Sequence, residues 1–237
     1  MKRRDILKTA ALGTAGVLSG VACAPEKKQE TVKAEVLTPA KPATLPTYGN
    51  DHFYENGKLS AKKTLDAYLE MMEFYNYPVD KFLRENMFIS DFSLGDFANA
   101  GMCGVFWHNS LEHNYFAHEI YLLPGQMIVE HCHLPTKIAK AKMETWQVRH
   151  GSIYTFSDDE ETKDLKVKLP ESQQPHITAR HCVEVKRGEM ATLNRLEAKH
   201  FMMAGPQGAI VSEYASYHDN DGLKFTNPNV VFNNVLS

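Results

Sequence analysis

From Met87 onward the sequence is a series of short apolar runs separated by Gly, Asn, Asp and Pro, and this pattern constrains the fold more than any other feature. Such runs, bounded by turn residues, are typical of β-strands. We expect strands at residues 101–107, 115–123, 127–133, 145–156, 165–169, 177–185, 190–193 and 210–214. Many short strands at regular spacing predict an all-β antiparallel sandwich or barrel. No internal repeat or second folded domain is evident.

The preceding segment, residues 50–88, carries a helical pattern. Its apolar residues recur at helical intervals, at Leu65, Leu69, Met72, Tyr75 and Phe82. Pro78 has no backbone N–H and cannot continue a helix, so we expect two helices with a break between them. We expect this apolar stripe to pack onto the sheet. The alternative is a surface for a ligand or a partner.

The composition excludes some classes of function. The chain has 237 residues, of which 43% are hydrophobic and 23% charged, as in an ordinary soluble protein with a sizeable core. The formal net charge of −3 gives no electrostatic reason to bind nucleic acid, and no basic stripe interleaved with aromatic residues follows the N-terminal segment. A small molecule is therefore the expected partner.

The N-terminus, residues 1–23, indicates export. Lys2-Arg3-Arg4-Asp5-Ile6-Leu7-Lys8 resembles a twin-arginine signal, and the apolar run after it is shorter than the about 20 residues of a transmembrane helix. The alternative is a basic N-terminus followed by an amphipathic helix. The run that ends at Cys23 resembles a lipoprotein processing site, with simple cleavage near residues 22–24 as the alternative. We therefore expect a periplasmic protein or a membrane-anchored lipoprotein.

Residues 24–49 differ in composition from the rest of the chain. They are mostly Lys, Glu, Thr, Ala and Pro, which cannot bury a core and are typical of a disordered, extended linker. The expected organisation is a signal peptide at 1–23, a linker at 24–49, a helical segment at 50–88 and one β domain at 89–237.

The strand expected at 127–133 ends with a pair of histidines, His131 and His133. Side chains at i and i+2 point to the same face of a strand, so one ion can lie between them. With Glu144 and His200 they form a set of three imidazoles and one carboxylate, which is typical of a divalent transition-metal site. The alternative is core histidines bonded to the backbone. That is also the expectation for His52, His108, His113, His118, His150, His176 and His181.

The order of these residues resembles the signature motifs of the cupin superfamily. The first motif is matched by Gly125, His131, His133, Glu144 and Gly151, with a longer gap than usual before the glutamate. The second is matched more weakly, by Gly188 and His200. The resemblance implies an RmlC-like jelly-roll β-barrel with an N-terminal helical segment.

Further stretches resemble the D-lyxose isomerase family of cupins. These are Ser93-Leu94-Gly95-Asp96-Phe97, Lys142-Met143-Glu144 and the stretch from Glu213 to Asp221. The resemblance implies a homodimer that acts on a sugar. It also implies a divalent metal, commonly manganese and otherwise Fe, Co, Ni or Zn, held by residues that match His131, His133, Glu144 and His200.

An aldose–ketose isomerase moves a proton between C1 and C2 of a sugar while the carbonyl changes place. Glu213 is the candidate base for this transfer, and Lys142 the candidate group to stabilise an oxyanion or donate a proton. Their alternatives are an exposed strand-end glutamate and a solvated loop lysine. Glu144, as a ligand, is expected to stay ionised and is a poor base. His218 and Asp219 are expected to contact the substrate.

Other hypotheses remain open for the same ligand set. A cupin dioxygenase would hold iron or another redox metal and would favour an apolar pocket. The predicted rim is instead polar, with Lys142, Glu213, His218, Asp219 and Asn220. A non-catalytic exported protein could also use the metal to dock a sugar. Separately, a disulfide between Cys103 and Cys182 is one option in an oxidising compartment.

Overall fold

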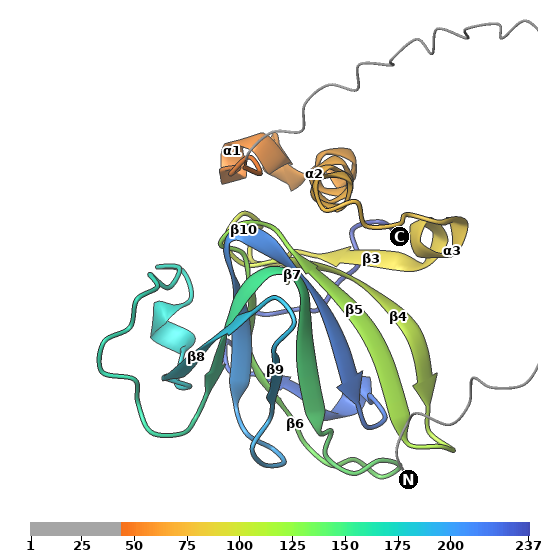
Figure 1. Ribbon diagram of the computed structural model, residues 1–237, viewed down its shortest axis with the longest axis vertical. Helices are drawn as coiled ribbons and strands as arrows, with labels where there is room; N and C mark the ends of the chain where they lie inside the picture. Colours follow the sequence, from red (N-terminus) through yellow and green to blue (C-terminus); the bar gives the residue numbers. More distant parts are fainter. Residues whose placement is uncertain (1–43) are drawn as a thin grey trace, which may run out of the picture. The chain divides into compact units, whose positions relative to one another are not determined.

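The structure of the protein is a computed structural model that describes residues 44–237 (Figure 1). The expected signal peptide at 1–23, with Cys23, lies outside the described residues, as does most of the expected linker at 24–49. Among the described helices, none is long and apolar enough to cross a membrane.

The first part of the described chain forms short helices and a small hairpin. Helix α1 (Asn50–Phe53) precedes the paired strands β1 (Tyr54–Glu55) and β2 (Lys58–Leu59), and α2 (Ala61–Phe74) and α3 (Lys81–Asn86) follow. The expected break around Pro78 is confirmed. Helix α3 begins at Asp80, whose carboxylate accepts a hydrogen bond of 2.8 Å from the backbone N–H of Leu83 and so caps the new helix.

The rest of the chain forms one curled antiparallel sheet of nine strands, which confirms the prediction of an all-β fold (Figure 1). Strand β10 lies at its centre, paired with β7 along one edge and with β6 and then β5 along the other. The strands are β3 (Met87–Ser90), β4 (Met102–Ser110), β5 (Tyr115–Leu122), β6 (Met127–His133), β7 (Glu144–Ser157), β8 (His181–Lys186), β9 (Met190–Thr192), β10 (His200–Ala215) and β11 (Leu223–Phe225).

Strands β7 and β10 pass very close to each other at a pair of glycines. The register shifts between Ala204 and Ala209, and both Gly151 and Gly208 have positive φ, of 69° and 68°. A Cβ atom at Gly151 would lie 2.0 Å from the carbonyl oxygen of Gly208, so no larger residue fits there. This irregularity bends both strands and helps the sheet to curl.

Helix α2 covers the outer face of the sheet (Figure 1). Its side chains Tyr68, Met71 and Met72 are fully buried in one apolar cluster with residues of the sheet such as Val105 and Tyr121. Packing onto the sheet is therefore confirmed for this segment. Burying each such side chain stabilises the fold by about 1.5–3 kcal/mol.

The connection between β7 and β8 departs from the expected strands. Residues 165–169 and 177–180 are irregular, although Leu169 and Ile177 are buried in the inner core. In the second stretch, a carboxylate takes the place of a neighbouring strand as hydrogen-bond acceptor. Buried Glu130 accepts hydrogen bonds of 2.7 Å from the backbone N–H groups of Thr178 and Ala179. The apolar pattern therefore reflects a packed loop and was wrongly assigned to strands.

The cysteines of the described chain are free thiols. Cys103 is buried beneath the helices, whereas Cys182 lies on β8 opposite Phe156 of β7. The structure therefore contains no bridge between Cys103 and Cys182.

Candidate active site

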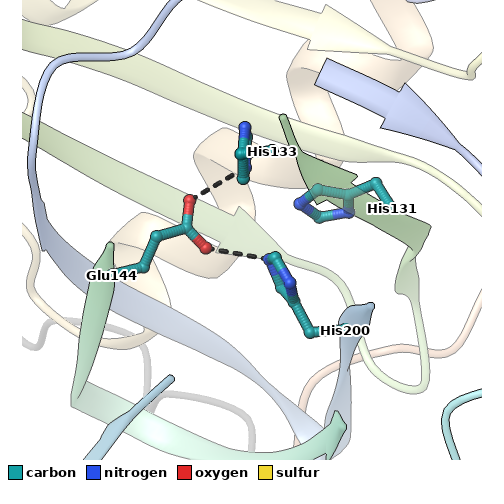
Figure 2. Close-up of side chains that lie close together, drawn as sticks. All are labelled: His131, His133, Glu144 and His200. Atoms are coloured by element: carbon teal, nitrogen blue, oxygen red, sulfur yellow. Dashed lines mark ion pairs between the residues drawn. The ribbon is translucent and has the colours of Figure 1, made fainter. Parts of the chain in front are cut away.

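Strand register brings the predicted ligands to one place on the inner face of the sheet. His131 on β6 lies directly opposite His200 on β10, and His133 follows two residues later on the same face. Glu144 is the first residue of β7. One ligand atom from each of the four residues lies within 4.8 Å of the others, and Figure 2 shows the side chains converging.

Backbone carbonyls fix the orientation of two of the imidazoles. Nδ1 of His131 donates to the carbonyl of Val129 at 2.9 Å, and Nδ1 of His200 donates to that of Ala198 at the same distance. Because a carbonyl only accepts, this arrangement places the proton on Nδ1 and leaves the lone pair of Nε2 free. Such outer hydrogen bonds are the usual way to hold a metal-binding histidine.

Two nitrogen atoms of this cluster, Nε2 of His133 and Nε2 of His200, have no hydrogen-bond partner. Nε2 of His200 lies 2.9 Å from Oε2 of Glu144, and Nε2 of His133 lies 3.1 Å from Oε1 (dashed lines in Figure 2). Neither of these nitrogen–oxygen pairs has the geometry of a hydrogen bond, and both nitrogen atoms are buried. Buried polar atoms normally have partners. Converging lone pairs of three imidazoles and a carboxylate fit a divalent transition metal.

The protonation states of His131 and Glu144 suit metal binding. Burial, together with the nearby His200 and His133, holds the pKa of His131 well below its usual value, so its ring is neutral. Burial acts to raise the pKa of Glu144, but the charge of Lys142 and the two neighbouring imidazoles lower it well below the ordinary range. Glu144 is therefore ionised, as a ligand must be.

Lys142 and Glu213 form a buried ion pair beside the cluster. Nζ of Lys142 contacts Oε1 of Glu213 and lies 2.6 Å from Oε1 of Glu144. Burial acts to lower the pKa of Lys142, but the two carboxylates raise it above its usual value, so it is charged. Lys142 and Glu213 are only 4% and 5% exposed. The alternatives of a solvated lysine and an exposed glutamate are therefore wrong.

His118 is a site residue that sequence reasoning missed. It lies directly opposite Glu213 in the pairing of β5 with β10, and its Nδ1 is 3.1 Å from Oε2 of Glu213. Its Nε2 is buried without a hydrogen-bond partner, above Gly104. Sequence reasoning placed His118 among ordinary core histidines because its contact with Glu213 depends on a strand pairing across 95 positions.

Glu213 thus lies between two buried groups. Burial acts to raise its pKa, but Lys142 and then His118 lower it, so the net shift is downward and the carboxylate is ionised. The contacts run from His118 through Glu213 and Lys142 to Glu144. This series of contacts links the candidate base, Glu213, to the candidate metal ligands.

The two predicted substrate-binding residues are placed differently. His218 lines the same cavity as Glu213, and its Nε2 lies 2.9 Å from Oδ1 of Asn220. Burial, with smaller contributions from Lys142 and His133, lowers its pKa to about 4, so the ring is neutral. Asp219 does not line the cavity; its carboxylate accepts a 2.7 Å hydrogen bond from Thr136. The structure does not bring Asp219 to the site.

A cavity contains the whole cluster, and its empty space, together with the part that is open to solvent, is about 590 Å³. Its polar lining residues are His118, His131, His133, Lys142, Glu144, His200, Glu213 and His218. Apart from the indole N–H of Trp146, the other residues that line it are apolar, and aromatic side chains dominate: Phe88, Phe92, Phe106, Phe116, Trp146, Phe201, Phe225 and Phe232. Of the five residues expected at a polar rim, Lys142, Glu213 and His218 line the cavity, and Asp219 and Asn220 do not.

The sequence resembles characterised sugar isomerases. The chain is 31% identical over 173 residues to the D-lyxose/D-mannose isomerase of Thermosediminibacter oceani, an alignment that covers 73% of this chain and 94% of the relative. It is 32% identical over 146 residues to the D-lyxose ketol-isomerase of Cohnella laeviribosi, covering 62% and 79%. No family model matches the chain.

Solved structures share the fold. The L-ribose isomerase of Acinetobacter sp. DL28, in complex with L-ribose, aligns with a TM-score of 0.55 at 11% identity and covers 71% of this chain and 92% of its own. The ligand-free L-ribose isomerase of Cellulomonas parahominis gives 0.52 at 12% identity, with coverage of 71% and 92%. These similarities confirm the expected cupin-type fold. The 31% identity to the Thermosediminibacter enzyme over most of both chains shows that this chain belongs to the D-lyxose isomerase family of sugar isomerases.

Proposed function

We propose that this protein is a metal-dependent aldose–ketose isomerase of the D-lyxose ketol-isomerase type, which interconverts a sugar such as D-lyxose with its ketose, D-xylulose. Membership of the family supports the reaction class. The observation that carries the proposal is the position of Glu213: an ionised carboxylate, buried in the cavity and paired with Lys142 and His118, next to the candidate ligands.

His131, His133, Glu144 and His200 would hold the metal. When bound, a divalent ion, most simply Mn²⁺ with Fe, Co, Ni or Zn as alternatives, supplies a Lewis acid for the two neighbouring sugar oxygens. The carbonyls of Val129 and Ala198 keep two of these imidazoles aimed inward.

The other residues of the cavity would carry the proton transfer. Glu213 removes the proton from C2 of the aldose and returns it to C1, while the hydroxyl proton of O2 moves to O1. Lys142, held between Glu213 and Glu144, stabilises the negative charge that develops on the sugar oxygens. His118 fixes the orientation of the Glu213 carboxylate. The aromatic walls exclude water and so strengthen these interactions.

The aromatic lining of the cavity favours one second candidate, a cupin dioxygenase. An apolar pocket is what that hypothesis predicts for an aromatic or thiol substrate. The buried base at Glu213 and the family favour the isomerase. A non-catalytic sugar-binding protein, the third hypothesis, gives no role to a buried base.

Assembly and location rest on the sequence alone. We propose a homodimer, as the family resemblance implies, and export by the twin-arginine route to the periplasm, with lipid attachment at Cys23. The resemblance of residues 2–8 and of the run ending at Cys23 to export and processing signals supports this proposal.

The decisive experiment is an assay of purified, metal-loaded protein against a panel of pentoses and hexoses in ²H₂O. The expected result is a ketose, with deuterium at C1 to the extent that the proton on Glu213 exchanges with solvent before it is returned, and no product from Glu213→Gln. Oxygen uptake on another substrate, with no aldose–ketose pair interconverted, would refute the isomerase and support the dioxygenase. Saturable binding of a sugar that is never converted would support the binding protein.

A further inference from the structure

Four phenylalanines form one continuous wall of the cavity, which we call the aromatic wall: Phe88, Phe92, Phe225 and Phe232. They come from separate segments, namely β3, the turn after it, β11 and the C-terminal segment. Ring centroids of Phe88 and Phe232 lie 5.7 Å apart, those of Phe92 and Phe232 6.1 Å, and those of Phe92 and Phe225 6.0 Å. These are ordinary distances for packed aromatic pairs.

The aromatic wall adjoins the polar groups on two sides. The Phe225 ring lies 6.0 Å from that of His131, and the Phe88 ring stacks on that of His118 at 5.8 Å. Phe88 and Phe225 are half-buried and Phe232 is 38% exposed, so part of their surface is left uncovered. A ligand bound through the metal site therefore meets phenyl rings as soon as it extends beyond the polar groups.

The polar groups of the cavity are few and already assigned. The metal cluster, Lys142 and Glu213 serve C1, C2 and their oxygens. Nδ1 of His218 and Nε2 of His118, both buried without a partner, and the indole N–H of Trp146 are the other polar groups of the lining. Among the residues that the structure describes, no Ser, Thr, Asn, Gln, Asp or Arg side chain lines the cavity. Side chains of these types are the ones expected to bind the remaining hydroxyls of a sugar.

An open-chain aldose normally carries an oxygen on every carbon. A hydroxyl that extends along Phe92, Phe225 and Phe232, away from His118, would lose water on entering and would meet phenyl rings. Burying a hydroxyl without a hydrogen-bond partner weakens binding by about 10- to 100-fold. A methyl group at the same place would instead gain contact with the rings.

We propose that the aromatic wall selects aldoses whose carbon chain ends in a methyl group, such as 5-deoxypentoses and 6-deoxyhexoses, over the corresponding fully hydroxylated sugars. The proposal rests on the isomerase function proposed above and adds the class of substrate. It assigns to the aromatic wall the role of a specificity determinant, separate from the residues that move the proton.

The test compares pairs of sugars that differ only in the terminal hydroxyl, in both enantiomeric series: lyxose with 5-deoxylyxose, and mannose with 6-deoxymannose. The metal-loaded full chain is expected to give a kcat/KM at least about tenfold higher for the deoxy member of at least one pair, chiefly through a lower KM. If every sugar that is converted shows an equal or higher kcat/KM with its terminal hydroxyl, the inference is overturned while the isomerase stands. If no aldose is converted, the proposed function itself fails.

A pair of variants isolates the aromatic wall. Phe232→Tyr places a hydroxyl on its most exposed ring and should lower the preference for the deoxy sugar severalfold. Phe82→Tyr, the matched control on α3, changes a phenylalanine that is 45% exposed and does not line the cavity, so the preference should not change. An unchanged preference in Phe232→Tyr would exclude this ring from the specificity determinant, and the same result for Phe225→Tyr would overturn the role of the wall.

Discussion

The two faces of the sheet are built from the same strands but differ in how their polar groups are satisfied. On the outer face, under α2, the polar atoms are paired: the hydroxyl of Tyr68 donates to Gln126 at 2.6 Å, and that of Tyr121 donates to Tyr77 at 3.1 Å. On the inner face, buried nitrogens of His118, His133, His200 and His218 have no hydrogen-bond partner. The alternation of side chains along each strand separates the two environments.

This difference in hydrogen bonding indicates that the outer face contributes mainly to stability and the inner face mainly to catalysis and metal binding. The outer face is a paired apolar core, and its main contribution is to the free energy of unfolding. The inner face carries a free-energy cost, because its polar groups are buried before any partner arrives. Changes to the inner face should therefore affect catalysis and metal binding more than stability, and changes to the outer face should do the reverse.

Among substitutions, the largest effect on kcat is expected from Glu213→Gln on the inner face. Losing the base should lower kcat by about 10²–10⁴-fold with little change in the midpoint of unfolding. The matched control is Glu119→Gln, a buried carboxylate on the outer face that accepts hydrogen bonds from Trp107 and Ser212. Steady-state kinetics and thermal melts check both variants. A kcat within tenfold of wild type for Glu213→Gln would remove Glu213 from the mechanism.

On the outer face, Met71→Ala is expected to lower the free energy of unfolding by about 2–5 kcal/mol, because it leaves a cavity in a fully buried core. The value of kcat measured at 25 °C should not change. Urea denaturation measures the free energy of unfolding. Met190→Ala, at a position 62% exposed on β9, is the control and should change neither quantity. A large loss of kcat in a folded Met71→Ala would contradict the separation of the two faces.

Removal of the metal is expected to destabilise the protein as well as to abolish turnover. An ion that binds only the folded state adds about 2.7 kcal/mol at a concentration 100 times its dissociation constant. Melting curves with and without a chelator measure this, and re-addition of Mn²⁺ or Co²⁺ should restore the midpoint. The midpoint of His200→Ala should not respond to metal, whereas that of His113→Ala, at a position exposed to solvent, should respond as in wild type. A wild-type melting point that is independent of metal would count against the site.

The smallest effect is expected for His118, which acts by positioning Glu213. His118→Leu should lower kcat by about tenfold with KM nearly unchanged, because the hydrogen bond to Glu213 is lost. His118→Gln keeps a side-chain N–H donor and should recover part of the loss. Equal kcat values for the two variants would indicate that the ring serves packing only.

Parts of this fold followed from the sequence because the signal was local. Strand β6 (Met127–His133) has the bounds that the sequence predicts, and Pro78 marks the break between α2 and α3. The predicted strand at 210–214 is much longer in the structure, as β10, because the run from Gly205 to Gly208 interrupts the apolar pattern without ending the strand. Strands β3 and β11 are short and have only weak patterns.

The candidate site was predicted only in part. The cluster of His131, His133, Glu144 and His200 follows from their order along the chain, as a match to a known motif. The partnership of His118 with Glu213 depends on register between distant strands, and so does the aromatic composition of the cavity. Asp219 was expected at the site from its neighbours in sequence, but its carboxylate caps a local turn, where it accepts from the backbone N–H of Asp221.

The carboxylate of Glu130 has a further consequence for the long connection between β7 and β8. Glu130 is adjacent to the candidate ligand His131 in β6. Its carboxylate accepts hydrogen bonds from the backbone N–H groups of Thr178 and Ala179 and from the hydroxyl of Thr226. Those amide protons should exchange with solvent as slowly as amides within the sheet. In this protein, the irregular stretch around Thr178 and Ala179 is therefore expected to be as rigid as the strand that holds it.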